Sequence, residues 1–441
     1  MDGMKRFLNL FVGLLLIVSV TAQEPYVLRL EEQTVTGLPG LHSFAAAQYD
    51  GNWILLGGRT DGLHMKQPFA SFHPDYNNVH ITVVNTRSRQ VIRMPLDRLP
   101  VAVAEQLQSS NMEFVQADSL LFLFGGYGYS ASQNRFLTHP RVTVVSLPAL
   151  LRSATTQTSL AEAIQSIEDN RVAVTGGGVG LLNGRFYLAG GQKFTGRYNP
   201  HGPDHGSGFV QEYTNAIRSF ELQQQNGQWV IVNFREWVDK NELHRRDYNL
   251  VPQYFTNGKP GFTMFSGVFR YDADLPWLHP VDFDEQGYQP RPAFQQKFSH
   301  YHAAHIPLYS KRQHQMHAVF FGGIAQYFIQ DSAVQEDKEV PFVTTISQVT
   351  RLSDGTWNEQ VLPVQMPGLL GTSAWMAVNE QLPMLQGGIV DWDLLPEGEQ
   401  LLGYIIGGIR STAPNIFWPN TGKQSTASSS VFAVYVRKKQ N

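Results

Sequence analysis

A short run of hydrophobic residues that ends in two glycines recurs along the chain. The clear copies cover residues 53–58, 121–126, 186–191, 318–323 and 402–408. A weaker copy at residues 262–267 has Ser266 in place of the first glycine. The second glycines, at positions 58, 126, 191, 267, 323 and 408, lie 56 to 85 residues apart. Repetition at such an interval indicates that one structural unit is used six times.

Each unit contains four strand-sized segments with turn residues between them. In the first unit the segments are residues 42–49, 53–56, 79–85 and 90–96. Asn-Gly or Asp-Gly pairs, which favour hairpin turns, start at positions 50, 183, 226, 257 and 354. The apolar runs are continuous, so we expect strands that are buried on both faces. The pattern predicts an all-β fold of six four-stranded antiparallel blades arranged as a β-propeller.

The last unit is one strand short, because its third strand, residues 431–436, is followed by only five residues. The strand-like segment 26–30 precedes the first unit and has no other partner. We therefore expect this N-terminal strand to complete the sixth blade and close the ring. A capping box at Ser159 and Glu162 predicts a short helix that extends to about Ile167.

The repeat resembles the kelch motif, in which a Gly-Gly pair is followed by an aromatic residue and a tryptophan. Gly190-Gly191 is followed by Phe220 and Trp229, and Gly322-Gly323 is followed by Trp357. The resemblance covers residues 24–441 and implies a kelch-type propeller. The chain departs from the motif at Ser266-Gly267, and its second unit has no clear tryptophan.

Composition removes several classes of chemistry. The chain has no cysteine among 441 residues, which excludes disulfides, cysteine-ligated zinc and iron–sulfur clusters. The kelch-like copper oxidases need a tyrosine linked to a cysteine, so that cofactor cannot form, and we expect no cofactor. The net charge of -3 provides no basic surface for nucleic acid.

The N-terminus has the pattern of an export signal. Lys5 and Arg6 precede an apolar run at residues 7–20, and Val20-Thr21-Ala22 is a small-residue cleavage site. We expect a signal peptide at residues 1–22 and a single propeller domain at residues 23–441, secreted or periplasmic, with no membrane span after cleavage.

The loops that follow the Gly-Gly pairs are longer than a hairpin needs, and long loops on a rigid scaffold often form binding sites. They carry aromatic residues that can stack on sugar rings and arginines that can donate hydrogen bonds. We expect a ligand-binding face that contains Arg59, His64, Tyr127, Tyr129, Arg197, Tyr198, Arg270, Tyr271, Tyr327, Arg410 and Trp418.

The resemblance also extends to the sialic acid mutarotases, which are six-bladed kelch proteins. Their acid–base chemistry needs a carboxylate or histidine that faces the channel, and the candidates here are His42, Glu113, Asp247 and His302. In a strand, His300 and His302 would point to one side and His305 to the other, so we expect no metal site there. The main prediction is a propeller that binds a glycan or an extracellular protein. The alternatives are an envelope enzyme, such as a mutarotase, isomerase or lyase, and a protein scaffold.

Overall fold

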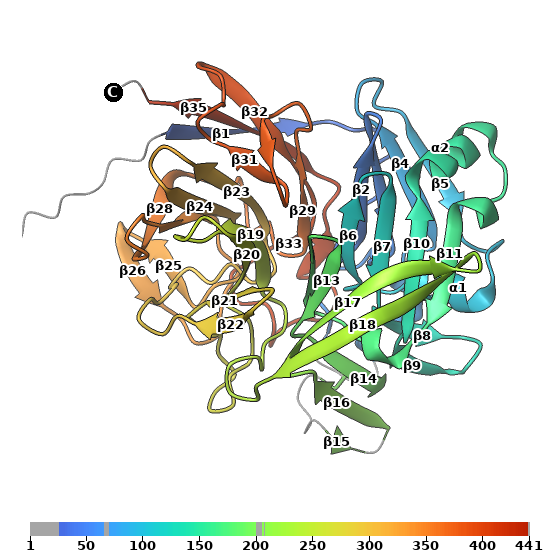
Figure 1. Cartoon of the computed structure of the whole chain (residues 1–441). Helices are drawn as coiled ribbons and strands as arrows, with labels where there is room; N and C mark the ends of the chain where they lie inside the picture. Colours follow the sequence, from blue (N-terminus) through green and yellow to red (C-terminus); the bar gives the residue numbers. More distant parts are fainter. Residues whose placement is uncertain (1–25, 66–69, 200–204, 207, 440–441) are drawn as a thin grey trace, which may run out of the picture.

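The computed structural model describes residues 26–439, apart from residues 66–69, 200–204 and 207. The fold is all-β, as predicted, and most of its sheets have four antiparallel strands (Figure 1). The predicted signal peptide, residues 1–22, lies outside the described residues. In the part of the chain that is described, no helix is long and apolar enough to cross a membrane.

Six sets of four antiparallel strands follow one another along the chain. The first three sets are β2 (Ala45–Tyr49), β3 (Asn52–Leu56), β4 (His80–Asn85) and β5 (Val91–Pro95); β6 (Glu113–Ala117), β7 (Leu120–Phe124), β10 (Arg141–Ser146) and β11 (Ile164–Glu168); and β12 (Gly178–Leu182), β13 (Arg185–Ala189), β17 (Ala216–Gln225) and β18 (Gln228–Val238). The other three are β19 (Asn249–Tyr254), β20 (Pro260–Phe265), β21 (Val281–Asp284) and β22 (Gly287–Pro290); β23 (Ala304–Ser310), β24 (Gln315–Phe321), β27 (Thr345–Arg351) and β28 (Trp357–Gln365); and β29 (Ala374–Val378), β32 (Glu399–Gly407), β35 (Val431–Lys438) and β1 (Tyr26–Gln33).

The first strands of these sets contact one another in cyclic order. β2 contacts β6, and the contacts continue through β12, β19, β23 and β29 back to β2. The apolar side chains between sheets follow the same order. Ile54 packs toward the β6 sheet, whereas its neighbour Leu55 packs toward the β29 sheet. Alternate residues of β3 therefore face different sheets, which explains why the apolar runs are continuous.

β1 and β35 form the pairing that the sequence predicts between the N-terminal segment and the last strand. Eight residue pairs run antiparallel, from Tyr26 opposite Lys438 to Gln33 opposite Val431. The two strands lie side by side at the top of Figure 1. The buried Tyr26 also donates a hydrogen bond to Gln348 in the neighbouring sheet, so this pairing links the start of the chain to two sheets.

The Gly-Gly pairs stand where the second strand of a sheet ends against its neighbour. Gly125 and Gly126 have φ of +61° and +90°, a region that favours glycine. A Cβ atom at Gly125 would overlap the carbonyl oxygen of Val174, which precedes the first strand of the next sheet. Conformation and crowding therefore both require glycine there.

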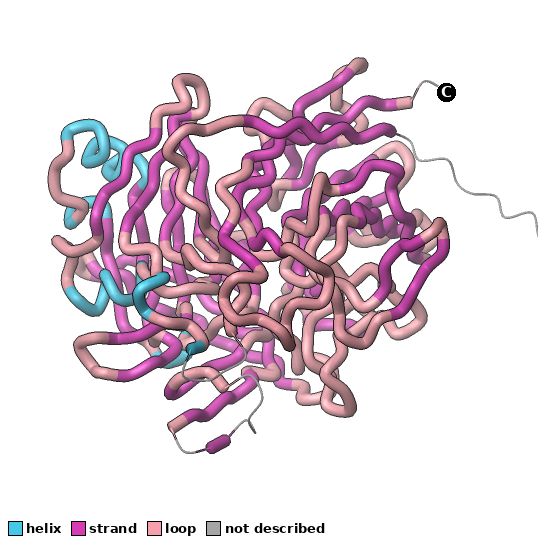
Figure 2. Tube along the Cα trace, turned by 180° about the vertical axis from the view of Figure 1, so that it is seen from behind, coloured by secondary structure: helices cyan, strands magenta, loops and turns pink. Residues whose placement is uncertain are grey.

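The helix predicted at residues 159–167 is wrong. That segment forms a 3₁₀ turn, η3 (Ala161–Ala163), and then the edge strand β11, because Ile164–Glu168 pairs with β10. The helices lie elsewhere, at α1 (Val101–Leu107) and α2 (Leu147–Thr156), with 3₁₀ turns η2 (Pro74–Tyr76) and η4 (Asn170–Val172). Figure 2 shows that the helical segments gather at one side of the molecule, beside the sheets.

The remaining strands are insertions into the loops. β8 (Tyr127–Ser130), β9 (Arg135–Thr138), β14 (Gln192–Gly196), β16 (Phe209–Tyr213) and β15 (His205–Gly206) form a five-stranded sheet at the bottom of Figure 1. Two hairpins are β25 (Tyr327–Gln330) with β26 (Ala333–Glu336), and β33 (Ile409–Ser411) with β34 (Ser425–Ala427). β31 (Ile389–Asp391) pairs in parallel with β23 and antiparallel with β30 (Met384–Leu385).

Candidate functional site

A cavity of about 730 Å³ opens where all six strand sets meet. Its walls come from two kinds of segment: those that precede the first strand of each set, and those that follow the second strand. Residues from Arg59 to Trp418 therefore meet in one place although they are far apart in the sequence. The volume falls within the range typical of small-molecule sites.

One position with left-handed backbone precedes the first strand of each set, and all of these except His302 line the cavity: Ser43, Asn111, Gly176, Asp247, His302 and Ser373. Backbone hydrogen bonds join several of them in order. Asn111 N donates to Ser43 O at 3.0 Å, and Ser43 N donates to Ser373 O at 3.2 Å. The residues at these positions are mostly small or polar because asparagine, aspartate and glycine tolerate positive φ best.

One wall of the cavity is a stack of three aromatic rings. The ring of His244 lies between Tyr213, at a centroid distance of 3.7 Å, and Tyr271, at 3.8 Å. Nδ1 of His244 lies 2.9 Å from Oδ1 of Asn215, which orients the imidazole. Burial lowers the pKa of His244 to about 4, so the ring is neutral at pH 7. Tyr271 is 61% exposed and therefore presents one face at the cavity mouth.

Another part of the wall is a buried aromatic cluster on the five-stranded sheet. Tyr127, Phe194 and Tyr198 pack together there, and Phe72 packs against them. The hydroxyl of Tyr127 donates to Gly196 O at 3.0 Å and accepts from Tyr198 N at 2.8 Å. The hydroxyl of Tyr127 thus already donates one hydrogen bond and accepts another within the protein, which gives this residue a packing role.

Arg246 and Asp247 form the most polar part of the cavity. Arg246 is 6% exposed and lies among the rings of Tyr198, Tyr213 and Phe269, with its guanidinium carbon 5.0 Å from the Phe269 centroid. Its Nε lies 3.8 Å from Oδ2 of Asp247, too far for a hydrogen bond. Tyr301 donates its hydroxyl to the same carboxylate oxygen at 2.9 Å.

Seven of the eleven ligand-binding candidates line the cavity: Arg59, His64, Tyr127, Tyr198, Arg270, Tyr271 and Trp418. Arg59 lines it with its charge already compensated, because Asp61 accepts from Nε at 2.8 Å and from Nη2 at 2.6 Å. Burial lowers the pKa of His64 to about 4.

The other four candidates do not line the cavity, and each has a partner elsewhere, as Tyr327 has in Lys297, which lies over its ring. Arg197 donates to Ser71 O at 3.0 Å and lies over the ring of Phe136. Tyr129 donates to Asn134 at 2.6 Å, and Arg410 donates to Ser430 at 2.9 Å. Tyr327 begins the β25–β26 hairpin.

The catalytic candidates divide in the same way. His42 and Asp247 line the cavity. Glu113 is buried and accepts from Gly177 N at 2.7 Å, and burial raises its pKa to about 8. His302 is not among the lining residues, and its Nδ1 lies 3.5 Å from Oγ of Ser373.

The histidine-rich segment differs from its predicted strand geometry. β23 begins at Ala304, and both His300 and His302 precede it with positive φ, so alternation along a strand does not apply to them. His300 lies 2.6 Å from both Gly322 O and Ser347 Oγ and is buried. Across the described residues, no three His, Asp or Glu side chains come close enough together to hold a metal ion.

Sequence reasoning missed Tyr213, His244, Arg246 and Tyr301. Arg246 and Tyr301 precede the first strands of their units, at the position that His42 and Ser110 hold in the first two. Comparing the six units at that position would have drawn attention to both. No sequence signal marks Tyr213 or His244, since their stack depends on two separate loops meeting.

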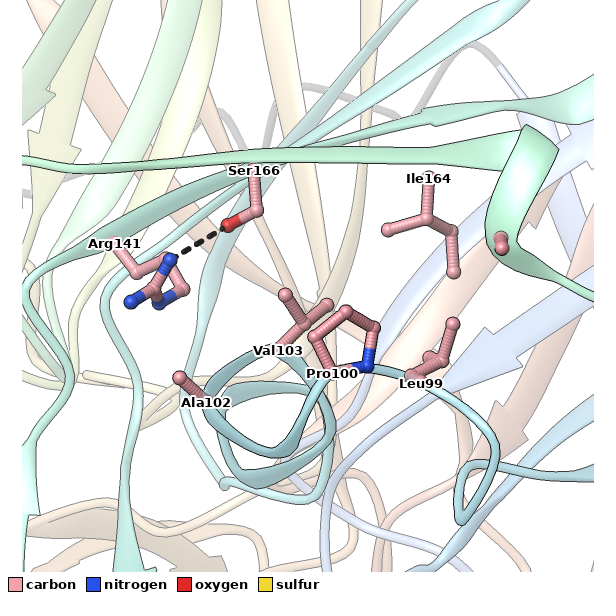
Figure 3. A pocket seen from close by; sticks show the side chains of 8 residues that line it. Leu99, Pro100, Ala102, Val103, Arg141, Ile164 and Ser166 are labelled. Carbon is pink, nitrogen blue, oxygen red and sulfur yellow. Dashed lines mark hydrogen bonds between the residues drawn. The ribbon is translucent and has the colours of Figure 1, made fainter.

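A second, smaller hollow of about 340 Å³ lies between α1 and β11 (Figure 3). Leu99, Pro100, Val103 and Ile164 are among the residues that line it. Its arginine, Arg141, donates to Ser166 Oγ at 3.3 Å and pairs with Glu168. The hollow thus has a mixed lining, in which the charge of its arginine is compensated.

Comparison with protein-family models gave no match for this chain, and comparison with curated proteins gave none either.

Proposed function

We propose that this protein is a six-bladed, kelch-type β-propeller that binds a glycan in its central cavity. The propeller is supported by the cyclic order of contacts among the first strands and by the pairing of β1 with β35. The Gly-Gly pairs occupy equivalent places at the end of the second strands. We also propose that it is exported, since its N-terminal pattern is that of a signal peptide.

The observation that carries the glycan proposal is the stack of Tyr213, His244 and Tyr271 beside Arg246 and Asp247. Aromatic faces suit the apolar faces of sugar rings, and nearby charged and amide groups suit their hydroxyls. Gln192 and Gln211 add amide groups to the same cavity. A cavity of this size lined in this way fits a mono- or oligosaccharide.

The test is a glycan screen on the mature chain, followed by calorimetry with the best ligand. We expect Tyr271→Ala to weaken binding by roughly thirtyfold, the effect of losing one anchor of about 2 kcal/mol. Tyr76→Ala is the matched control, because Tyr76 is also a half-exposed tyrosine but does not line the cavity. Equal affinities for the wild type and the Tyr271 variant would contradict the proposal. Binding of a protein partner in place of any glycan would favour the scaffold alternative.

The second candidate function is an acid–base sugar enzyme of the mutarotase, isomerase or lyase kind. It is favoured by one observation, the Asp247 carboxylate that faces the cavity beside the Tyr301 hydroxyl. A carboxylate in that position can take a proton from a hydroxyl of a bound sugar and return it later. The test is anomeric exchange of the bound sugar, measured by NMR with the wild type and Asp247→Asn. Exchange at the uncatalysed rate in both would remove this alternative.

A further inference from the structure

The guanidinium of Arg246 has donors that its surroundings leave unused. A guanidinium carries five N–H donors. Within the described part of the chain, Nη2 donates to the Tyr198 hydroxyl at 3.4 Å, and Nε has no partner within hydrogen-bond distance. A buried charge with few hydrogen bonds is costly unless another group supplies them. Because Arg246 lines the cavity, a bound ligand is in a position to do so.

Asp247 is the acceptor beside these donors. Its carboxylate is held by the Tyr301 hydroxyl at Oδ2, and the backbone at Gly176 approaches Oδ1 so closely that a Cβ there would lie 2.8 Å from it. The side chain is therefore fixed within the cavity wall. A fixed acceptor next to a fixed donor is the arrangement that matches neighbouring hydroxyls, since each hydroxyl both donates and accepts.

The charges around the cavity do not favour an anionic ligand. Among the described residues, its cationic lining consists of Arg59, Arg246, Arg270 and Lys338, which makes four. Five carboxylates oppose them: Asp247, Asp274 and Glu339 in the lining, and Asp61 and Asp272, which pair with Arg59 and Arg270. A charge on His42, which lies 3.6 Å from Asp61, would at most balance this count. An acidic sugar would therefore meet no excess positive charge.

We propose that the cavity selects an uncharged sugar, and that Arg246 and Asp247 together bind adjacent hydroxyls of that sugar. This inference rests on the glycan-binding function proposed above and goes beyond it in naming the class of ligand and the residues that read it. Arg246 donates from its Nη atoms to hydroxyl oxygens, and Asp247 accepts from the hydroxyl protons. The exposed face of Tyr271 lies at the mouth, where the next sugar unit would stack.

The experiment compares neutral oligosaccharides with size-matched oligosaccharides that carry a uronic acid, using calorimetry on the mature chain. The decisive variant is Asp247→Asn, because asparagine tolerates the positive φ of 52° at this position. The matched control is Asp118→Asn, which has a φ of 49° and lies in an exposed turn outside the cavity. Melting temperatures of both variants establish that they are folded.

The wild type is expected to bind the neutral series more tightly than the acidic series. Asp247→Asn should weaken neutral binding by roughly ten- to hundredfold, the usual effect of losing a hydrogen bond to a charged group, and Asp118→Asn should not. Tighter binding of the acidic series, strengthened further in Asp247→Asn by the loss of a repelling charge, would overturn the inference and leave the glycan proposal standing. Neutral binding that is unchanged in Asp247→Asn would also overturn it. If neither series binds, the glycan-binding function itself fails.

Discussion

Substitutions in β1 test whether the N-terminal strand stabilises the whole fold. Leu28 is buried in the core shared by β1, β35 and the β23 sheet, whereas its neighbour Val27 is 44% exposed. Leu28→Ala removes a buried side chain and leaves a cavity, which costs about 2–5 kcal/mol. Val27→Ala in the same strand should change the free energy of unfolding by less than about 0.5 kcal/mol.

The assay is urea denaturation of the mature chain, with thermal melting as a second measurement. For a chain of this length, about 1 kcal/mol corresponds to roughly 1 °C in Tm, so Leu28→Ala should lower Tm by about 2–5 °C. Removing residues 26–33 altogether should cost more and reduce solubility, because the edge of β35 loses its partner. Equal, small effects of Val27→Ala and Leu28→Ala would refute the reasoning, since β1 would then contribute nothing through burial.

Three further predictions concern the core and the cavity surroundings. Asp282→Ala should cost about 3–5 kcal/mol, because it strands the buried Arg351 that Asp282 binds at 2.7 and 2.9 Å. The exposed pair of Arg270 and Asp272 provides the control, and Asp272→Ala should cost under about 1 kcal/mol in urea denaturation. Burial raises the pKa of Glu113 from its usual 4.5 to about 8. Between these two pH values the folded state keeps a proton that the unfolded chain has lost. The free energy of unfolding therefore falls as pH rises, including the range from 6.5 to 8. Glu113→Gln should remove about 2 kcal/mol of that fall, and an unchanged slope would contradict it. Adding copper, zinc or a chelator to the mature chain should leave Tm unchanged, and a stoichiometric metal content that is lost in His302→Ala would reverse this expectation.

The set of residues that lines the cavity depends on contacts between loops, whereas the positions of the strands do not. Arg59 and Arg197 both lie in segments that follow a Gly-Gly pair, yet one lines the cavity and the other lies over Phe136. Arg246 escaped prediction because it stands before a strand and not in a long loop. Its importance comes from the rings that surround it, which three separate parts of the chain supply.

The sequence by itself determined the all-β class, the six repeated units, the sites of the tight turns and the pairing of residues 26–30 with the last strand. These features follow from local periodicity and from glycine at positions where only positive φ fits, so they can be read without knowing the neighbours. The tertiary structure alone decided which side chains face the cavity and which are neutralised, as Arg59 is by Asp61. Tertiary structure also made the segment after Ser159 an edge strand instead of a helix, since its pairing with β10 outweighed the local capping signal.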